Sequence, residues 1–204
     1  MKTKIGSLFL FLFLTSGAGC GKKEFFTDYI PLSMGSVWVF EDNDGSMAEI
    51  EITDDSLTAY RDTIFKLFFL GNNIDFMKTP NTLSWRLTKR YLIEDREVVL
   101  EDRYYPFFEM PFIEGKTRHI VYENHDSYSG AYFKRVYDYT YGMEHERVRV
   151  DITSDVLYVY NNDSVNDVSS YTFFLSPDTG FVKIIYTLNG KVHNLKLKEY
   201  KKGE

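Results

Sequence analysis

The sequence predicts an all-β fold: an antiparallel, strongly curved sheet or half-open barrel of about ten strands in a single domain. Apolar and polar residues alternate in many short runs, which is the period of a strand with one buried face. Turn signals rich in Gly, Pro, Asn and Asp separate these runs at fairly regular spacing. Phe, Tyr and Trp, which favour strands, make up 17% of the 204 residues.

The first two predicted strands form a hairpin. Residues 37–40 (Val-Trp-Val-Phe) are β-branched and aromatic, and residues 49–52 (Glu-Ile-Glu-Ile) alternate polar and apolar. Residues 42–45 (Asp-Asn-Asp-Gly) lie between them and supply the turn. Residues 54–62 are the exception, where we expect a short helical turn capped by Asp55.

The middle of the chain continues the strand pattern. Alternating runs occupy residues 65–69, 83–87 and 148–152, with predicted turns at 71–73 and 94–97. Residues 105–112 do not alternate, and their two prolines exclude a central strand because proline cannot donate to the ladder. We therefore expect residues 105–112 to form an apolar loop or an edge that covers part of the sheet.

The last predicted element is a hairpin. Asn189-Gly190 lies between the apolar run 184–188 and the alternating run 192–197. Asn and Gly both accept the positive φ of a type I′ turn, so this pair is the strongest short hairpin signal in the chain.

Residues 1–19 predict an export signal that ends at a cysteine. Lys2 and Lys4 precede an apolar run at residues 8–14, and small residues lead to Cys20, the single cysteine of the chain. The run is too short to cross a hydrocarbon core as a helix, which takes about 20 residues. A basic head, a short apolar run and small residues before a cleavage site are typical of a secretory signal peptide.

The residues before Cys20 resemble the lipobox of bacterial lipoproteins. This resemblance implies cleavage after residue 19 and a lipid on the Cys20 thiol that attaches the chain to a membrane. An ordinary cleaved signal with a stray cysteine and an uncleaved anchor are the alternatives. Residues 20–28 would then form the lipidated cysteine and a charged tether, and residues 29–204 a single β domain. Residues 20–24 also loosely resemble the charged export signals of Bacteroidetes lipoproteins, although a soluble spacer explains them equally well.

The charge of the chain restricts its partners. The formal net charge is -6, and it becomes -8 if Lys2 and Lys4 are removed with the signal. An acidic surface argues against nucleic acid, whose phosphates must be neutralised by Lys and Arg. No second hydrophobic segment is long enough to span a bilayer. We therefore expect attachment through Cys20 alone, in the bacterial cell envelope and at the outer membrane. This expectation does not distinguish the periplasmic face of that membrane from its outer face.

Three short motifs resemble those of a broad group of uncharacterised bacterial lipoproteins. The opening motif is Tyr29-Ile30-Pro31-Leu32 with Gly35 and Trp38-Val39-Phe40, the middle motif is residues 111–117, and the closing motif is residues 174–183. The architecture expected for this group is similar to that of the curved-sheet lipoprotein carriers of the LolA and LppX type. That resemblance implies a concave face that holds acyl chains, by analogy of fold alone.

The candidate catalytic and metal-binding residues are few. His119, His125 and His145 lack partners at a recognisable spacing for a metal site, and we interpret them as solvated. Adjacent carboxylates such as Glu101-Asp102 point to opposite faces of a strand, and we interpret them as solvated surface residues. The chain has no Gly-x-Ser-x-Gly elbow and no Gly-rich phosphate loop. We expect a noncatalytic protein with no metal and no cofactor. A hydrolase would need one of these histidines to meet a carboxylate in a polar cleft.

The aromatic surplus is the most informative functional signal. Its simplest interpretation is a packed core with cross-strand aromatic pairs. A second is a cavity that binds an apolar ligand and is lined by Trp38, Phe40, Phe65, Phe69 and Trp85. A third is an external contact surface rich in tyrosine. We expect a carrier or receptor for an apolar small molecule. The alternative is a protein-interaction or structural envelope lipoprotein whose core is filled by its own side chains.

Overall fold

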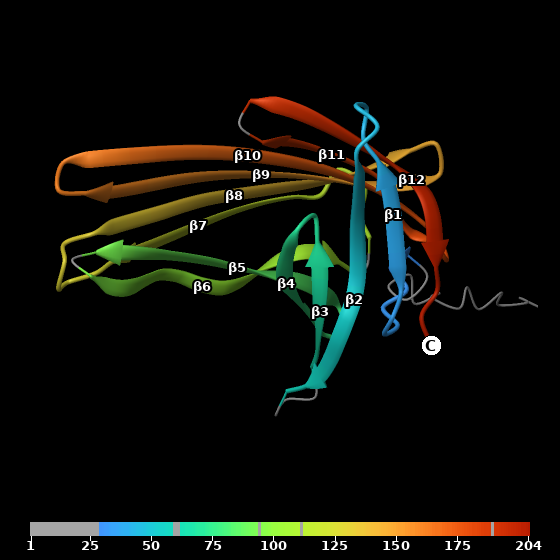
Figure 1. Cartoon of the computed structure of the whole chain (residues 1–204), viewed down its shortest axis with the longest axis horizontal. Coiled ribbons are helices and arrows are strands. Elements are labelled where there is room, and N and C mark those ends of the chain that lie inside the picture. The colour runs from blue at the N-terminus through green and yellow to red at the C-terminus, as the bar shows by residue number, and fades with distance from the viewer. Residues whose placement is uncertain (1–28, 59–61, 94, 111, 189) are drawn as a thin grey trace, which may run out of the picture.

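The computed structural model describes residues 29–58, 62–93, 95–110, 112–188 and 190–204 (Figure 1). The predicted signal peptide, Cys20 and the tether lie outside the described residues. The strands are β1 (Val37–Glu41), β2 (Met47–Leu57), β3 (Thr63–Phe69), β4 (Asn72–Lys78), β5 (Thr82–Ile93), β6 (Arg96–Glu109), β7 (Thr117–His125), β8 (Tyr132–Glu144), β9 (Arg147–Tyr160), β10 (Asp163–Ser176), β11 (Gly180–Leu188) and β12 (Lys191–Lys201).

All twelve strands belong to one antiparallel sheet with the order β6-β5-β4-β3-β2-β1-β12-β11-β10-β9-β8-β7. The sheet curves until it is nearly closed, so the predicted all-β curved sheet or half-open barrel is confirmed, with two strands more than expected. Both predicted terminal hairpins are present, as β1–β2 and β11–β12.

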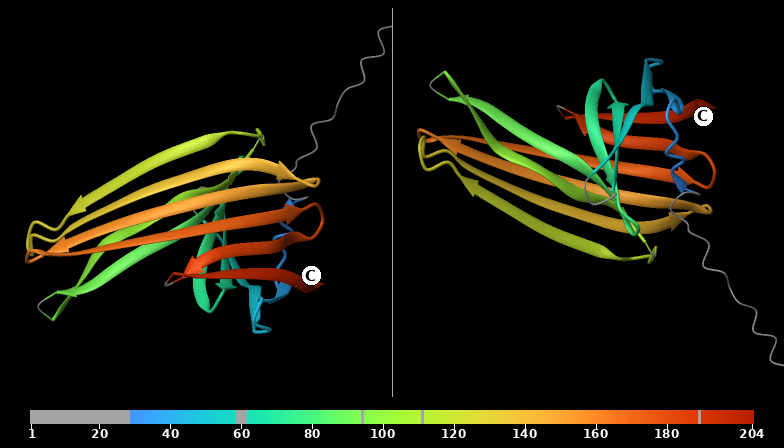
Figure 2. Two further views of the ribbon diagram at one scale, coloured as in Figure 1. Left: turned by 90° about the horizontal axis from the view of Figure 1, so that it is seen from above. Right: turned by 90° about the horizontal axis from the view of Figure 1, so that it is seen from below.

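Unequal strand lengths divide the molecule into a short barrel and two projecting arms. Strands β1, β3 and β4 have five to seven residues, whereas β5, β6 and β8 to β10 have twelve to fourteen. The hairpin β5–β6 forms the lower arm and strands β7–β10 form the upper arm (Figures 1 and 2). The arms meet where Tyr91 of β5 stacks on Tyr158 of β9, with ring centroids 3.8 Å apart. The space between the arms is thus bounded by this stack and by the core of the barrel.

Side chains of the upper arm seal the seam between the two edge strands of the sheet, β6 and β7. Asn124 Nδ2 donates to the Leu100 carbonyl at 2.9 Å, and Tyr137 Oη donates to the Pro106 carbonyl at 2.9 Å. The Glu109 amide donates to Tyr141 Oη at 2.7 Å. Because these groups of β6 are already bonded, the edge does not offer a free row of backbone groups there.

The core of the barrel is aromatic and is closed by the opening and closing motifs. Trp38 is fully buried, stacks on Tyr200 at 5.2 Å, packs edge-on against Phe181 at 5.6 Å and donates its indole N–H to the Thr179 carbonyl. Gly180 has φ +78°, and a Cβ there would lie 3.3 Å from Trp38. The two motifs therefore share one packing site at the base of the barrel.

Residues 54–57 differ from the sequence expectation, whereas residues 105–109 agree with it. The predicted helical turn at residues 54–62 is wrong over residues 54–57, which belong to β2 and pair with β3; residues 59–61 lie outside the described residues. The ladder overrides the capping potential of Asp55 because residues 54–57 form backbone pairs with β3. Residues 105–109 belong to β6, which is an edge strand, so the exclusion of a central strand is confirmed. Pro106 lies at a β-bulge opposite Ser84, a position where proline is tolerated.

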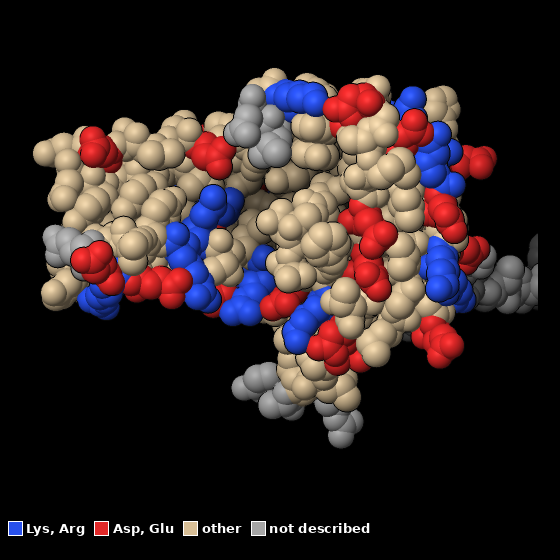
Figure 3. Space-filling model, in the orientation of Figure 1, with Lys and Arg blue, Asp and Glu red and all other residues tan. Residues whose placement is uncertain are grey.

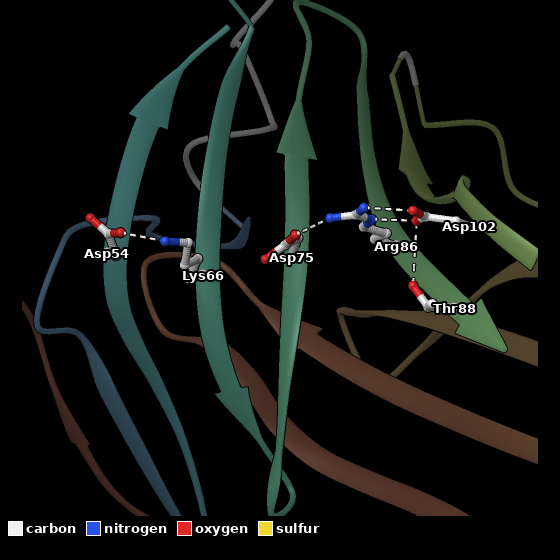
Figure 4. A network of polar contacts seen from close by, with 6 residues as sticks. All are labelled: Asp54, Lys66, Asp75, Arg86, Thr88 and Asp102. Atoms are coloured by element: carbon white, nitrogen blue, oxygen red, sulfur yellow. Dashed lines mark hydrogen bonds and ion pairs between the residues drawn. The ribbon is translucent and has the colours of Figure 1, made fainter. Parts of the chain in front are cut away.

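The convex face carries two groups of ion pairs, one between β2 and β3 and one that joins β4, β5 and β6 (Figure 4). Lys66 bonds Asp54 at 2.8 Å. Arg86 forms two bonds to Asp102, at 2.6 and 2.7 Å, and a third to Asp75 at 3.0 Å. Arg86 lies just beyond the last backbone pair of β4 with β5. Its side-chain bond to Asp75 therefore links the two strands where their backbone pairing has ended.

We expect Arg86→Lys to lower the free energy of unfolding by up to about 1 kcal/mol, because lysine cannot form the bidentate contact and the site is partly exposed. Urea unfolding at low and high salt measures the change. The loss should shrink at high salt, since these charges are screened. An equal loss at both salt concentrations would show that Arg86 acts through packing instead.

Candidate ligand cavity

A cavity of about 350 Å³ opens where two ladders of the sheet end. Strand β4 pairs with β5 only from Phe76–Trp85 to Lys78–Leu83, and β11 pairs with β10 only as far as Ser170–Thr187. Beyond these pairs the long strands β5 and β10 continue into the arms without β4 and β11 beside them. The cavity lies in this gap, and Figure 3 shows the hollow between the two arms, with Lys and Arg side chains at its edge.

The cavity lining is divided into an apolar part and a polar part. The apolar part lies against the barrel and comes from Phe69, Leu70, Ile74, Trp85, Leu87, Tyr171 and Tyr186, with the polar side chains of Asn72 and Thr187 beside them. The polar part lies between the arms and comes from Thr88, Lys89, Arg135, Ser154, Asp167 and Ser169, with the apolar side chains of Val156 and Val168 among them. The volume falls in the range of ligand sites, which is about 300–1,000 Å³. A ligand that fills this cavity would therefore meet two chemically different surroundings.

Trp85 forms the boundary between the cavity and the core. Its ring contacts Tyr171 at 5.7 Å and Phe107 at 5.6 Å, and its Nε1 donates to Tyr137 Oη at 3.0 Å. Burial raises the pKa of the Tyr137 hydroxyl well above its usual value of 10, so it remains protonated and donates onward to Pro106. These contacts fix the indole, and one part of it is left facing the cavity.

A buried ion pair forms the floor of the polar part. Arg135 of β8 donates to both carboxylate oxygens of Glu101 of β6, at 2.7 and 2.5 Å, and a third donor bonds Ser154 Oγ. Tyr105 Oη donates to Glu101 at 2.7 Å, and burial together with this bond raises the pKa of Tyr105. Both charged side chains are almost fully buried.

The interpretation of Glu101 as a solvated surface residue is wrong, and a β-bulge is the reason. Lys89 pairs with Glu101, but the next residue of β5, Arg90, pairs with Val99, so Leu100 is an extra residue in β6. The extra residue turns both Leu100 and Glu101 inward. Asp102 follows Glu101 and points outward, as expected for the residue after an inward one in a strand.

Two charged groups at the cavity lack an ion pair among the described residues. Lys89 shares the inward face of β5 with Trp85, Leu87 and Tyr91 and is half-buried. Asp167 of β10 lies across the cavity and is exposed at its rim. Neither side chain forms a salt bridge in the part of the chain that the structure describes. The polar part therefore carries one inner cation and one outer anion.

The five aromatic residues predicted for ligand binding fall into two groups. Phe69 and Trp85 line the cavity. Ligand binding by these two residues stays a prediction. Trp38, Phe40 and Phe65 lie in the packed core of the barrel and do not line the cavity. Residues that the sequence did not single out, including Lys89 and Tyr186, complete the lining. The alternation at residues 83–93 was the available signal for Lys89, because it places this lysine in register with Trp85.

The histidines of the predicted hydrolase alternative lie apart and exposed. His119 pairs with Asp138 at 2.6 Å on an exposed face, and His125 and His145 are exposed elsewhere. Among the described residues, no group of three or more His, Cys, Asp or Glu side chains is placed to hold a metal ion. The expected absence of a metal stays a prediction. In the same residues, no helix is long and apolar enough to span a membrane.

The fourth histidine forms a contact that the sequence did not suggest. His193 of β12 stacks on Tyr186 at 4.6 Å, and its Nδ1 lies 2.6 Å from the buried carboxylate of Asp42. Asp42 also accepts hydrogen bonds from the amides of Asn194 at 2.8 Å and Asn43 at 2.7 Å. Burial alone would raise the pKa of Asp42, but these bonds and His193 outweigh it and lower the pKa below 3.8.

We expect Asp42→Asn to lower the free energy of unfolding at neutral pH by about 1–3 kcal/mol, because hydrogen bonds to a charged acceptor are lost. Since folding depresses the pKa of Asp42, its contribution is present above pH 3.8 and is lost as the pH falls through the folded value. The stabilities of parent and variant should therefore converge in acid. Denaturant unfolding between neutral and acidic pH measures this, and a gap that stays constant with pH would contradict it.

Comparison with known proteins gives two distant structural likenesses. No protein-family model and no curated protein matches the chain. The chain is similar to a candidate lipoprotein from Parabacteroides distasonis ATCC 8503, with 10% identity and a TM-score of 0.40 over 85% of this chain and 99% of that chain. It is also similar to a candidate exported protein with a YmcC-like fold from Bacteroides fragilis NCTC 9343, with 9% identity and a TM-score of 0.40 over 86% and 99%. At this level of similarity neither likeness carries an argument about fold or activity.

Proposed function

We propose that the chain is a noncatalytic binding protein of the bacterial cell envelope, attached to the outer membrane through a lipid on Cys20. Its ligand is an apolar small molecule, or the apolar part of a larger one, held between the arms and the barrel. The cavity is the observation that carries the proposal. Half-buried Tyr171, Tyr186 and Leu87 face it together with Trp85, which is the kind of lining that ligand sites use.

The alternative is an interaction or structural lipoprotein with a self-filled core. The core of the barrel favours it in part, since Trp38, Phe40 and Phe107 are fully buried among their own neighbours. The cavity is the feature that this alternative leaves unexplained. A test of ligand binding therefore separates the two.

We expect straight-chain alcohols from hexanol to decanol to bind the full chain with an affinity that rises about fourfold per methylene, because each buried CH₂ contributes about 0.8 kcal/mol. Titration calorimetry measures the series. Leu87→Trp should weaken binding by occupying part of the apolar end of the cavity. Leu92→Trp is the matched control, because Leu92 lies on the same strand and is 74% exposed. Alcohols that bind without regard to chain length, or equally to both variants, would contradict the proposal.

A further inference from the structure

We propose that the ligand of this cavity is a zwitterionic amphiphile, with an anionic group next to its apolar tail and a cationic group farther out. The inference rests on the proposed function and names the class of head group. It follows from the order of charges along the cavity, from the half-buried cation Lys89 to the exposed anion Asp167.

The apolar part of the cavity sets the direction of the ligand. Phe69, Ile74 and Tyr186 line the end against the barrel, and all the charged groups line the end between the arms. A tail buried against the barrel places its head group among the polar side chains. The group attached directly to the tail then lies deeper than the group at the end of the head.

The deeper position is suited to an anion. Lys89 points inward beside Leu87, and its ammonium has no ion pair in the described residues. The nearby Arg135 is fully engaged with Glu101, so this pair adds no net charge. Ser154 Oγ accepts a bond from Arg135, which leaves its own proton to donate to an anionic oxygen. A charge-assisted bond to this half-buried side chain is less screened by water than one at the open surface.

The outer position is suited to a cation. Asp167 points inward from β10 in register with Ser169 and Tyr171, but it lies at the exposed rim and has no ion pair in the part of the chain that the structure describes. Lys89, Arg135, Glu101 and Asp167 together have no net charge. A ligand with two opposite charges in the matching order satisfies both unpaired groups, whereas a singly charged one leaves one of them unpaired.

Five amphiphiles with the same dodecyl tail test the order of charges. Dodecylphosphocholine has its anion inside and its cation outside, and the dodecyl sulfobetaine has the reverse order at the same net charge. Dodecyl sulfate, dodecyltrimethylammonium and dodecyl maltoside supply the anionic, cationic and uncharged heads. We expect dodecylphosphocholine to bind the full chain about tenfold more tightly than the sulfobetaine, each measured by calorimetry below its micelle concentration; tenfold is about 1.4 kcal/mol.

Two variants assign the charges to their side chains. Lys89→Gln should weaken dodecylphosphocholine and dodecyl sulfate, whereas Asp167→Asn should weaken dodecylphosphocholine and dodecyltrimethylammonium. Lys196→Gln removes an exposed charge from β12, outside the cavity, and should change none of the five. Equal affinity for the two zwitterions, or affinities that ignore both variants, would overturn the inference while leaving an apolar cavity. Failure of all five to bind saturably would overturn the proposed function itself.

Discussion

Removing either partner of the buried pair between Arg135 and Glu101 is expected to lower the free energy of unfolding by about 3–5 kcal/mol, because it leaves an uncompensated charge inside the protein. Arg135→Met leaves the Glu101 carboxylate without its ionic partner, and Glu101→Gln leaves the Arg135 guanidinium without its ionic partner. The pair also joins β8 to β6 across the seam of the sheet, where the described residues form no backbone ladder between β6 and β7. Loss of the pair therefore loosens the floor of the cavity as well as the fold.

The double variant Arg135→Met with Glu101→Leu distinguishes this explanation from simple loss of contacts. Replacing a buried ion pair by apolar side chains of similar volume is often neutral or stabilising. We expect the double variant to cost clearly less than the sum of the single ones, as measured by urea unfolding. The exposed pair of Arg90 and Glu97 on the same hairpin is the control, with an expected effect of at most about 1 kcal/mol. Additive losses in the double variant would show that the single variants lose contacts and do not leave an uncompensated charge.

Trp38→Ala is expected to cost about 3–5 kcal/mol, the usual range for removing a large aromatic side chain from a core. Trp38 is fully buried and packs between Tyr200 and Phe181, so removing its side chain leaves a cavity inside the core. Phe68→Ala is the control, because Phe68 faces outward and is 37% exposed. We expect it to cost about 1 kcal/mol or less.

The Trp38→Ala variant also tests whether Trp38 is a core residue or a ligand-binding residue. As a core residue, it should change stability while the folded fraction still binds alcohols with the parent affinity. Unfolding and calorimetry on the same samples measure both quantities. A variant that is as stable as the parent but no longer binds alcohols would show that Trp38 belongs to the ligand site.

The strands and their hairpins were predictable because the relevant signals are local. Alternation at residues 49–52 and 148–152 and the turn at residues 42–45 each depend on adjacent residues, and β2, β9 and the β1–β2 hairpin follow them. The helical turn at residues 54–62 failed because a local cap competed with a ladder to β3 that the sequence does not display.

The candidate site was predictable only in part. Inward aromatic residues look the same in sequence whether they meet a core or a cavity, so Trp38 and Trp85 could not be separated. Their difference arises from the unequal lengths of paired strands, because β4 leaves β5 just beyond Trp85. The bulge at Leu100 has no signature in the alternation, and without it Glu101 cannot be placed beside Arg135, 34 residues away.

The most direct measurement uses the two tryptophans as reporters of where a ligand lies. Trp38→Phe leaves Trp85 at the cavity, and Trp85→Phe leaves Trp38 in the core. Both variants are titrated with 11-bromoundecanol, whose terminal bromine quenches indole fluorescence on contact. We expect saturable quenching in the variant that keeps Trp85 and none in the variant that keeps Trp38. Equal quenching in the two variants, or none in either, would contradict a ligand site between the arms and the barrel.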